Sequence, residues 1–197
     1  MEAVRLRDIG RNYNGKQVLS KLNIDFKPGV LTTVTGPSGC GKTTLLNIIS
    51  GLDDGYTGSV VGVPGKIAYM FQENRLLPWM SLLENIEFVV QPGGGANIGE
   101  ILEMLELSAH KDKKASELSG GMARRCALAR ALCYDAPLLL LDEPFNGLDR
   151  DLKLRIAEKL RDYFQQKNAT VILVSHDLEA VQALGGEVLA LDCAENS

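Results

Sequence analysis

The chain has 197 residues, a formal net charge of -4, and 45% hydrophobic and 23% charged residues, an ordinary composition for a globular protein that needs no metal or disulfide staples. The negative charge argues against a nucleic-acid binder that works by neutralising phosphates, and four cysteines without a Cys-x-x-Cys pair argue against a zinc site. No stretch approaches the roughly 18 apolar residues of a membrane span, and the N-terminal residues follow a strand pattern rather than that of a signal peptide.

The N-terminal quarter contains segments with strand patterns followed by a helix. Val4–Ile9 and Leu22–Phe26 alternate apolar and polar residues, as half-buried strands do. Val30–Thr35 is short and β-branched and follows a Lys-Pro-Gly turn signal. Lys42–Ser50 has the apolar spacing of a helix, with Gly51 as its stop. Strand, glycine-rich loop and helix therefore follow one another, which is the context that a phosphate loop requires.

The middle of the chain is predicted to be mostly helical. Lys66–Phe71 has the pattern of a strand, but Ser81–Val90 begins with a capping box, because its first residue is followed three positions later by Glu84. Gln91–Gly99 contains three successive glycines and is predicted to be a loop. Ile98–Leu107 has the apolar spacing of a short helix.

The C-terminal part again alternates strands and helices. Pro137–Leu141 is an almost wholly apolar run, which suits a parallel strand buried on both faces. Asp151–Gln166 is predicted to be a helix, Thr170–Val174 a second buried strand and Glu187–Leu191 a final strand. This alternation predicts an α/β fold, with a mostly parallel sheet flanked by helices and ligands at the carboxyl ends of the strands.

The chain is interpreted as one domain of two parts. Residues 1–74 and 135–197 are expected to form an α/β catalytic core, and residues 75–134 an inserted α-helical subdomain.

The segment Gly36–Thr44 fits the phosphate-loop pattern of Gly, four residues and Gly-Lys-Thr. Its glycines allow successive backbone N–H groups to point toward one anion, and the following helix adds its positive end. Lys42 is expected to reach the β- and γ-phosphates of ATP, and the Thr43 hydroxyl to ligate Mg²⁺. The alternative is an ordinary glycine-rich turn before a helix. The predicted nucleotide-binding residues of this loop are Gly36, Pro37, Ser38, Gly39, Cys40, Gly41, Lys42, Thr43 and Thr44.

Two acidic residues, Asp142 and Glu143, end the apolar strand that begins at Pro137. A carboxylate in this position can hold the Mg²⁺ shell, and a second one beside it can polarise the attacking water. We therefore assign Asp142 to the metal and Glu143 to the water. The alternative is a pair of solvated acids at the end of a strand.

A second glycine-flanked helix start lies at Leu118-Ser119-Gly120-Gly121. Ser119 is a good N-cap, and the two glycines expose the backbone N–H groups of the helix. An ordinary cap is the alternative interpretation. If this helix start faces the γ-phosphate of an ATP held by another copy, the nucleotide joins two chains into a dimer.

These motifs together resemble the nucleotide-binding subunits of ATP-binding cassette (ABC) transporters over essentially the whole chain. The resemblance implies a phosphate-loop NTPase core with an N-terminal antiparallel β part. It implies ATP hydrolysis in a head-to-tail homodimer, with Ser119, Gly120 and Gly121 completing the ATP site of the partner. Met122 departs from the family pattern, which usually has glutamine at this position.

Further residues match the family in order along the chain. By resemblance, Tyr13 stacks on adenine, although a strand-edge tyrosine is the alternative. Gln72 senses Mg²⁺ and water, and Gly147–Asp149 crosses the dimer interface. His176 contacts the γ-phosphate, although a lone histidine after a strand is more often structural. The resemblance thus implies Lys42, Gln72, Glu143 and His176 as catalytic residues and Thr43, Gln72 and Asp142 as metal-binding residues.

The segment that follows Gln72, through Trp79 to Ile86, is similar to subunits of the nitrate, sulfonate, taurine and thiamine-precursor importers. The resemblance implies peripheral attachment at the cytoplasmic face of the cell membrane, with this segment contacting membrane permease subunits and a solute-binding protein in the same system. Trp79 is a candidate anchor, unless it packs inside the subdomain. An exporter or lipoprotein-extraction ATPase, a soluble ABC ATPase and a binding-only cassette remain alternatives.

Cys40, inside the phosphate loop, is predicted to be an exposed thiol beside Lys42. A thiol reagent there is expected to block ATP binding, and ATP is expected to protect the cysteine.

Overall fold

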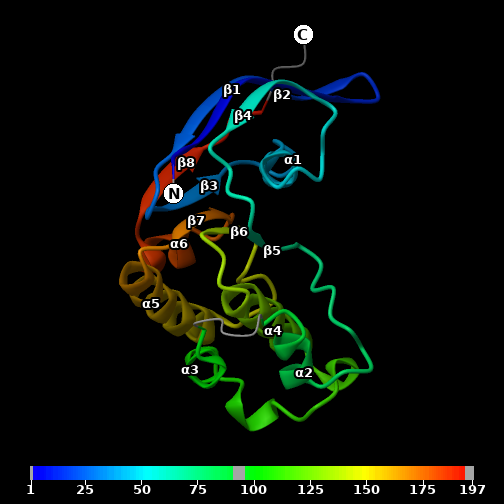
Figure 1. Ribbon diagram of the computed structural model, residues 1–197, viewed down its shortest axis with the longest axis vertical. Helices are drawn as coiled ribbons and strands as arrows, with labels where there is room; N and C mark the ends of the chain where they lie inside the picture. The colour runs from blue at the N-terminus through cyan, green and yellow to red at the C-terminus, as the bar shows by residue number, and fades with distance from the viewer. Residues whose placement is uncertain (1, 91–95, 194–197) are drawn as a thin grey trace.

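The computed structural model, which describes residues 2–90 and 96–193, contains two β-sheets and a group of helices (Figure 1). The first sheet is antiparallel with strand order β2-β1-β4, and the second is parallel with order β5-β6-β7-β3-β8. The predicted α/β fold with an N-terminal antiparallel part is therefore confirmed. The strands are β1 (Val4–Tyr13), β2 (Lys16–Phe26), β3 (Leu31–Thr35), β4 (Tyr56–Val61), β5 (Ile67–Met70), β6 (Leu138–Asp142), β7 (Thr170–Val174) and β8 (Glu187–Ala190).

The antiparallel sheet extends further than the sequence pattern indicated. β1 and β2 form a hairpin joined by Asn14 and Gly15, both at positive φ (51° and 85°). Asn-Gly is the preferred pair for such a two-residue turn, a signal that predicts this hairpin. β4 was not predicted, because Gly58 interrupts its pattern; a Cβ there would lie 2.3 Å from the Arg7 carbonyl oxygen of β1.

The inner strands β6 and β7 of the parallel sheet are buried on both faces, which explains the apolar run of β6. Leu138 and Leu140 face a core shared with α1 (Lys42–Ile49) and the antiparallel sheet. Leu139 and Leu141 face the core on the other side, which contains α4 (Gly120–Cys133), α5 (Arg150–Lys167) and α6 (Leu178–Leu184). In Figure 1, α1 lies between the two sheets, and the remaining helices lie beyond the parallel sheet. The short helix α6 was not predicted from the sequence.

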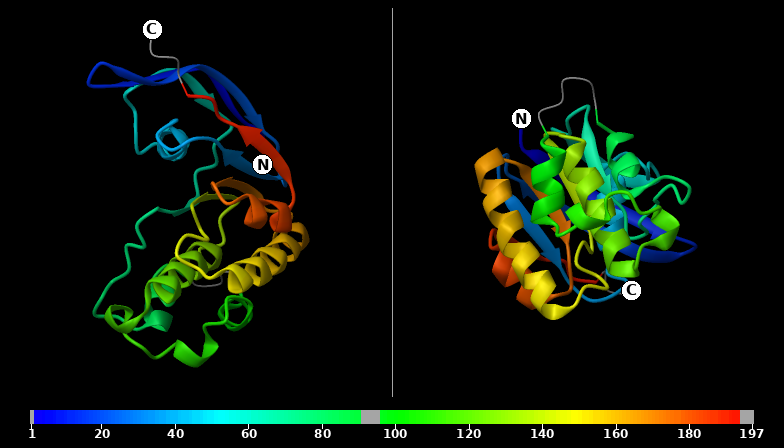
Figure 2. Two further views of the ribbon diagram at one scale, coloured as in Figure 1. Left: turned by 180° about the vertical axis from the view of Figure 1, so that it is seen from behind. Right: turned by 90° about the horizontal axis from the view of Figure 1, so that it is seen from below.

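The helical half of the molecule packs around α4 (Figures 1 and 2). It contains α2 (Leu82–Glu87), α3 (Ile98–Met104) and two short 3-10 helices, η1 (Ser108–His110) and η2 (Ala115–Glu117). The predicted capping box of α2 is present, since Ser81 and Glu84 each accept a hydrogen bond from the other residue's backbone N–H.

Two expectations about this half are left open or corrected. Of the predicted loop Gln91–Gly99, residues 91–95 lie outside the described residues and Gly99 belongs to α3, where Asn97 is the N-cap. The subdomain boundaries at residues 75 and 134 stay a prediction.

Within residues 2–90 and 96–193, every helix falls short of the length and hydrophobicity that a membrane span requires.

Candidate nucleotide-binding site

The phosphate loop joins the end of β3 to the start of α1 and needs glycine at two close approaches. Gly36 has a φ of 145°, and a Cβ there would lie 2.4 Å from the backbone oxygen of Leu191. Gly41, the N-cap of α1, has a φ of 99°, and a Cβ there would lie 2.7 Å from Leu19 Cδ2. Any larger residue would push the loop off β2 or the chain after β8, so the packing dictates both glycines.

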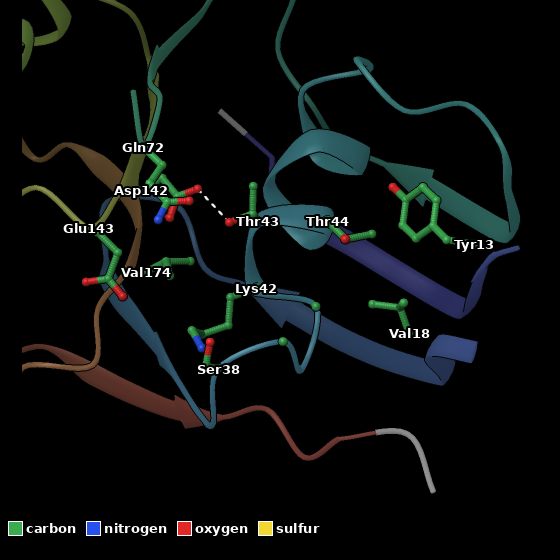
Figure 3. A pocket seen from close by; sticks show the side chains of 12 residues that line it. Tyr13, Val18, Ser38, Lys42, Thr43, Thr44, Gln72, Asp142, Glu143 and Val174 are labelled. Atoms are coloured by element: carbon green, nitrogen blue, oxygen red, sulfur yellow. Dashed lines mark hydrogen bonds between the residues drawn. The ribbon is translucent and has the colours of Figure 1, made fainter. Parts of the chain in front are cut away.

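A cavity of about 340 Å³ lies over this loop and extends from the end of β1 to the ends of β5, β6 and β7 (Figure 3). Because three of these strands belong to one parallel sheet, their carboxyl ends meet at one edge. The residues lining the cavity are Tyr13, Val18, Ser38, Gly39, Gly41, Lys42, Thr43, Thr44, Gln72, Asp142, Glu143 and Val174.

Oxygen atoms gather at one end of the cavity. The Thr43 hydroxyl donates a hydrogen bond of 2.8 Å to Asp142 Oδ2, and Gln72 lies beside this pair in Figure 3. Burial raises the pKa of Asp142, to which the charge of Glu143 adds, while the Thr43 hydrogen bond opposes the rise.

These oxygens fit a hard cation such as Mg²⁺, which is usually held by one or two carboxylates and by substrate phosphates. Among the described residues, no group of three His, Cys, Asp or Glu side chains forms an all-protein metal site. The Asp142 carboxylate and the Thr43 hydroxyl are donors that suit a cation which brings phosphate ligands of its own.

The ammonium group of Lys42 folds back onto the loop. Its Nζ donates to the backbone oxygens of Gly36 and Pro37, at 2.8 and 2.7 Å. The positive charge is therefore held beside the N-terminus of α1, where an anion is favoured.

Glu143 and His176 contact each other across neighbouring strands. Asp142 pairs with Val174 in the register of β6 and β7, so the residues just beyond both strands come together. His176 Nδ1 lies 2.8 Å from Glu143 Oε1; Glu143 lines the cavity and is largely buried, whereas the histidine ring is mostly exposed. Glu143 has a φ of 51°, a conformation that its backbone N–H maintains by donating to Val174 O at 2.9 Å.

Tyr13 lies at the opposite end of the cavity (Figure 3). Its hydroxyl bonds to Asp53, and the Arg11 guanidinium lies 4.2 Å from the ring centroid. Burial of Asp53 opposes its ionisation, but hydrogen bonds from Tyr13 and Arg11 outweigh that effect and lower its pKa. Arg11 and Val18 were not predicted here; the Asn-Gly hairpin that brings Val18 to the cavity was the available signal.

The second glycine-flanked helix start is not part of this cavity. Ser119 caps α4 by accepting from the Met122 N–H at 3.3 Å, but Ser119, Gly120 and Gly121 are absent from the described cavity lining. α4 and α1 lie on opposite sides of the parallel sheet (Figures 1 and 2). Gly121 instead packs on the loop at Gly147, since a Cβ there would lie 3.3 Å from the Gly147 oxygen.

Two exposure expectations are decided by the structure. Cys40 is only 1% exposed and lies in the core between the sheets, so the prediction of an accessible thiol is wrong. The loop curls around its side chain, and a Cβ at Gly36 would lie 3.0 Å from the Cys40 sulfur. Trp79 is 68% exposed, so the alternative that it packs inside the helical half is wrong.

Comparison with known proteins agrees with the resemblance seen in the motifs. The ABC transporter family matches residues 19–146. An aliphatic sulfonates import ATP-binding protein of Nocardia farcinica is 42% identical over 190 residues, covering 96% of this chain and 76% of that protein. Another, of Bacillus subtilis, is 40% identical over 184 residues, covering 88% and 72%.

Solved structures are similar over nearly the whole chain. A dimeric bacterial ABC transporter cassette is 29% identical with a TM-score of 0.85, covering 96% of this chain and 94% of that chain. A dimeric post-hydrolysis state bound to ADP and Pi is 29% identical with a TM-score of 0.83, covering 98% and 97%.

Proposed function

Since this chain belongs to the ABC transporter family, whose ATP-binding proteins are ATPases, we propose that it hydrolyses Mg-ATP to power import of a small solute through separate membrane subunits. The observation that carries the proposal is the single cavity that joins the phosphate loop to Asp142 and Glu143 at one end and to Tyr13 at the other. A nucleotide has this polarity, with charged phosphates at one end and an aromatic base at the other.

We assign the phosphates to the loop Gly36–Thr44 and to the start of α1. Lys42 would exchange its two carbonyl contacts for β- and γ-phosphate oxygens, which form stronger, charge-assisted hydrogen bonds. Tyr13 would receive the adenine, because one of its faces is covered by Arg11 and its hydroxyl is held by Asp53.

Magnesium would be held by Thr43, Asp142 and Gln72, next to the phosphate loop. When bound, the ion would neutralise charge on the β- and γ-phosphates. The Thr43 hydroxyl and the buried Asp142 carboxylate already lie in hydrogen-bonding contact, so little reorganisation of the protein is required.

We propose that Glu143 is the base that orients and polarises the attacking water. The water oxygen forms a bond to the γ-phosphorus, the bond to ADP breaks, and Glu143 accepts the proton of the water. His176 holds one carboxylate oxygen of Glu143 and, from its exposed position, would contact the γ-phosphate.

The second glycine-flanked helix start, Ser119-Gly120-Gly121, would act on the ATP of a second copy. The α4 start carries glycines and a serine cap but faces away from the cavity of its own chain, so its anion-binding amides would serve a partner. Two of the similar solved cassettes are dimeric, which supports a head-to-tail homodimer in the ATP-bound state.

Import of a sulfonate-type solute is the transport task that we propose. The curated relatives described above are import ATP-binding proteins for aliphatic sulfonates. In the Gln72–Ile86 segment, Leu82 and Ile86 are fully buried, whereas Trp79 is exposed and available to a membrane permease. The proposed assembly lies at the cytoplasmic membrane face and includes an extracytoplasmic solute-binding protein.

Replacing Glu143 by glutamine tests the proposal. Glu143→Gln keeps the size of the side chain but cannot accept the proton, so turnover should fall by about 100- to 10,000-fold. ATP should still bind, and size-exclusion chromatography with Mg-ATP should show a trapped dimer.

Lys42→Ala is the matched control for binding, because it should weaken ATP affinity itself. A Glu143→Gln protein that turns over like the wild type would contradict the role of Glu143. A variant that binds ATP but stays monomeric would contradict the composite site.

A further inference from the structure

A buried arginine, Arg124, lies in the first turns of α4 and contacts two segments that line the ATP cavity. It follows Ser119 by five residues and is only 3% exposed. Its Nη1 donates to the backbone oxygens of Phe71 and Gln72, both at 2.8 Å, and to Asn74 Oδ1 at 3.1 Å.

The other side of the same guanidinium contacts the end of β6. Nε and Nη2 donate to the backbone oxygen of Glu143, at 3.1 and 2.8 Å, and Nη2 also donates to the backbone oxygen of Asp142. Arg124 therefore joins the residues just beyond β5 to those at the end of β6. In the described part of the chain, no other side chain donates hydrogen bonds to both segments.

These carbonyl groups need a donor because the pairing of β5 with β6 ends here. β5 and β6 are paired only as far as Met70 and Leu141, and Asp142 then pairs with β7 alone, at Val174. A buried carbonyl without a partner is unfavourable, and a planar guanidinium with five N–H groups can satisfy several at once. A lysine ammonium is a compact point charge and cannot span both segments in the same way.

Arg124 also holds a residue whose backbone is in an unusual conformation. Glu143 has a positive φ of 51°, which a non-glycine residue keeps only when its surroundings dictate it. Its N–H donates a hydrogen bond to the Val174 backbone oxygen. Its carbonyl oxygen accepts hydrogen bonds from Arg124 and from the N–H of Asn146, the latter at 3.1 Å. The direction of the Glu143 side chain thus depends on this set of contacts.

We propose that Arg124 is a positioning residue for ATP hydrolysis, which fixes Gln72 and Glu143 relative to each other and to the helix that carries Ser119. The inference rests on the proposed function, since it assumes that Glu143 acts on the water. Through Arg124, docking of the α4 start on a partner's ATP would be transmitted to the Glu143 and Gln72 backbones of its own chain.

The test replaces Arg124 by lysine, which keeps the charge and loses the planar fork. Displacing Glu143 by about 1 Å is expected to lower kcat by about 100-fold. KM and the affinity for ATP should stay close to the wild-type values, because the hydrogen bonds of Arg124 go to the segments after β5 and at the end of β6 and not to the phosphate loop or Tyr13. Arg124→Gln provides a second variant, which removes the charge as well.

Arg130→Lys is the matched control. Arg130 also lies in α4, is half-buried, and donates to the backbone oxygens of Asn74 and Arg75 at 2.9 and 2.8 Å, neither of which lines the cavity. It should lower thermal stability like Arg124→Lys and keep the wild-type kcat per folded molecule.

Each outcome decides the question. A wild-type kcat in Arg124→Lys, or equal losses of kcat in the Arg124 and Arg130 variants, would overturn the positioning role. If both Arg124 variants lose ATP affinity to the same extent as kcat, Arg124 supports the fold of the site and the positioning role is wrong. If the wild-type chain has no ATPase activity, or Glu143→Gln keeps full activity, it is the proposed function that fails instead.

Discussion

The two glycine-flanked helix starts of this protein differ in what surrounds them. At α1, the loop, Asp142, Glu143 and Gln72 converge on one cavity. At α4, the Ser119 cap and Gly120 face no such cavity among the described residues, and a Cβ at Gly120 would meet no atom within 4 Å. The same local chemistry therefore lies over a cavity at one end, whereas at the other end we propose that it meets the ATP of a second copy.

Exposed hydrophobic side chains occur in both halves of the molecule. Leu52, just after α1, is 62% exposed, and Trp79 in the helical half is 68% exposed, whereas Leu82 and Ile86 are buried. Exposure alone therefore does not mark an interface, and we place the partner of Trp79 in another protein because Trp79 lies in the segment that resembles importer subunits.

The strongest test of this comparison substitutes each helix start in a separate protein and then mixes the two variant proteins. Lys42→Ala should lose ATP binding, and Ser119→Glu should place a negative charge where the partner's phosphate would dock, so each protein alone should lose about 100-fold in ATPase activity. In a 1:1 mixture, half of the dimers pair the intact phosphate loop of one chain with the intact Ser119 helix start of the other. Random pairing then restores about a quarter of wild-type activity.

The control for the mixture is a doubly substituted chain, Lys42→Ala with Ser119→Glu, mixed with either single variant. Such dimers lack a site with both halves intact, so ATPase activity should stay low. If the two single variants also fail to complement each other, the second helix start does not act on a partner's ATP.

A second test concerns the exposed Trp79. Trp79→Ala should leave the ATPase rate of the isolated chain unchanged, because Trp79 does not line the cavity. Solute uptake by the whole transporter should fall by about tenfold or more, as expected for loss of an aromatic anchor. Phe88→Ala is the control, since Phe88 is equally exposed (69%) but lies outside Gln72–Ile86. Equal uptake in both variants and the wild type would remove Trp79 from the interface.

The smallest expected effect is that of Asp142 on the thermal stability of the ATP-free protein. Burial raises the folded-state pKa of Asp142 above its unfolded value, so any stability that this group contributes is present at low pH and lost as pH rises through the folded pKa. Asp142→Asn should therefore raise the Tm of the ATP-free protein at neutral pH, by about 2–4 °C for each kcal/mol relieved.

Thermal unfolding at pH 7.5 and at acidic pH checks this sign, because the gain should shrink as Asp142 protonates in the wild type. Asp112→Asn is the control, since Asp112 is exposed and its neutralisation should leave Tm nearly unchanged. A lower Tm for Asp142→Asn at neutral pH would show that the Thr43 hydrogen bond outweighs the burial of the charge.

Local signals were sufficient for much of the fold. The apolar run before Asp142, the capping box at Ser81 and the strand-loop-helix order around Gly36 each depend on residues a few positions apart. The same reasoning missed β4, which Gly58 interrupts, and the short helix α6, and it shortened the β1–β2 hairpin by overlooking the turn at Asn14.

Exposure was less predictable than secondary structure. Cys40 sits in a loop, which favours exposure, yet the loop curls over the side chain and buries it against Gly36. Trp79 has the largest apolar surface of any residue type, which favours burial, yet it is exposed. Both depend on which elements pack nearby, and that information is distributed over the whole chain.

The sequence by itself determined which residues could serve an ATPase, because a phosphate loop, a strand ending in Asp142-Glu143 and a capped glycine helix start are encoded by neighbouring residues. Only the tertiary structure decided how they meet. Because β6 lies between β5 and β7, His176 just beyond β7 contacts Glu143 just beyond β6. The same order brings the carbonyl groups after β5 and at the end of β6 within reach of Arg124. Strand order arises from long-range burial of both sheet faces, and no local pattern contains it.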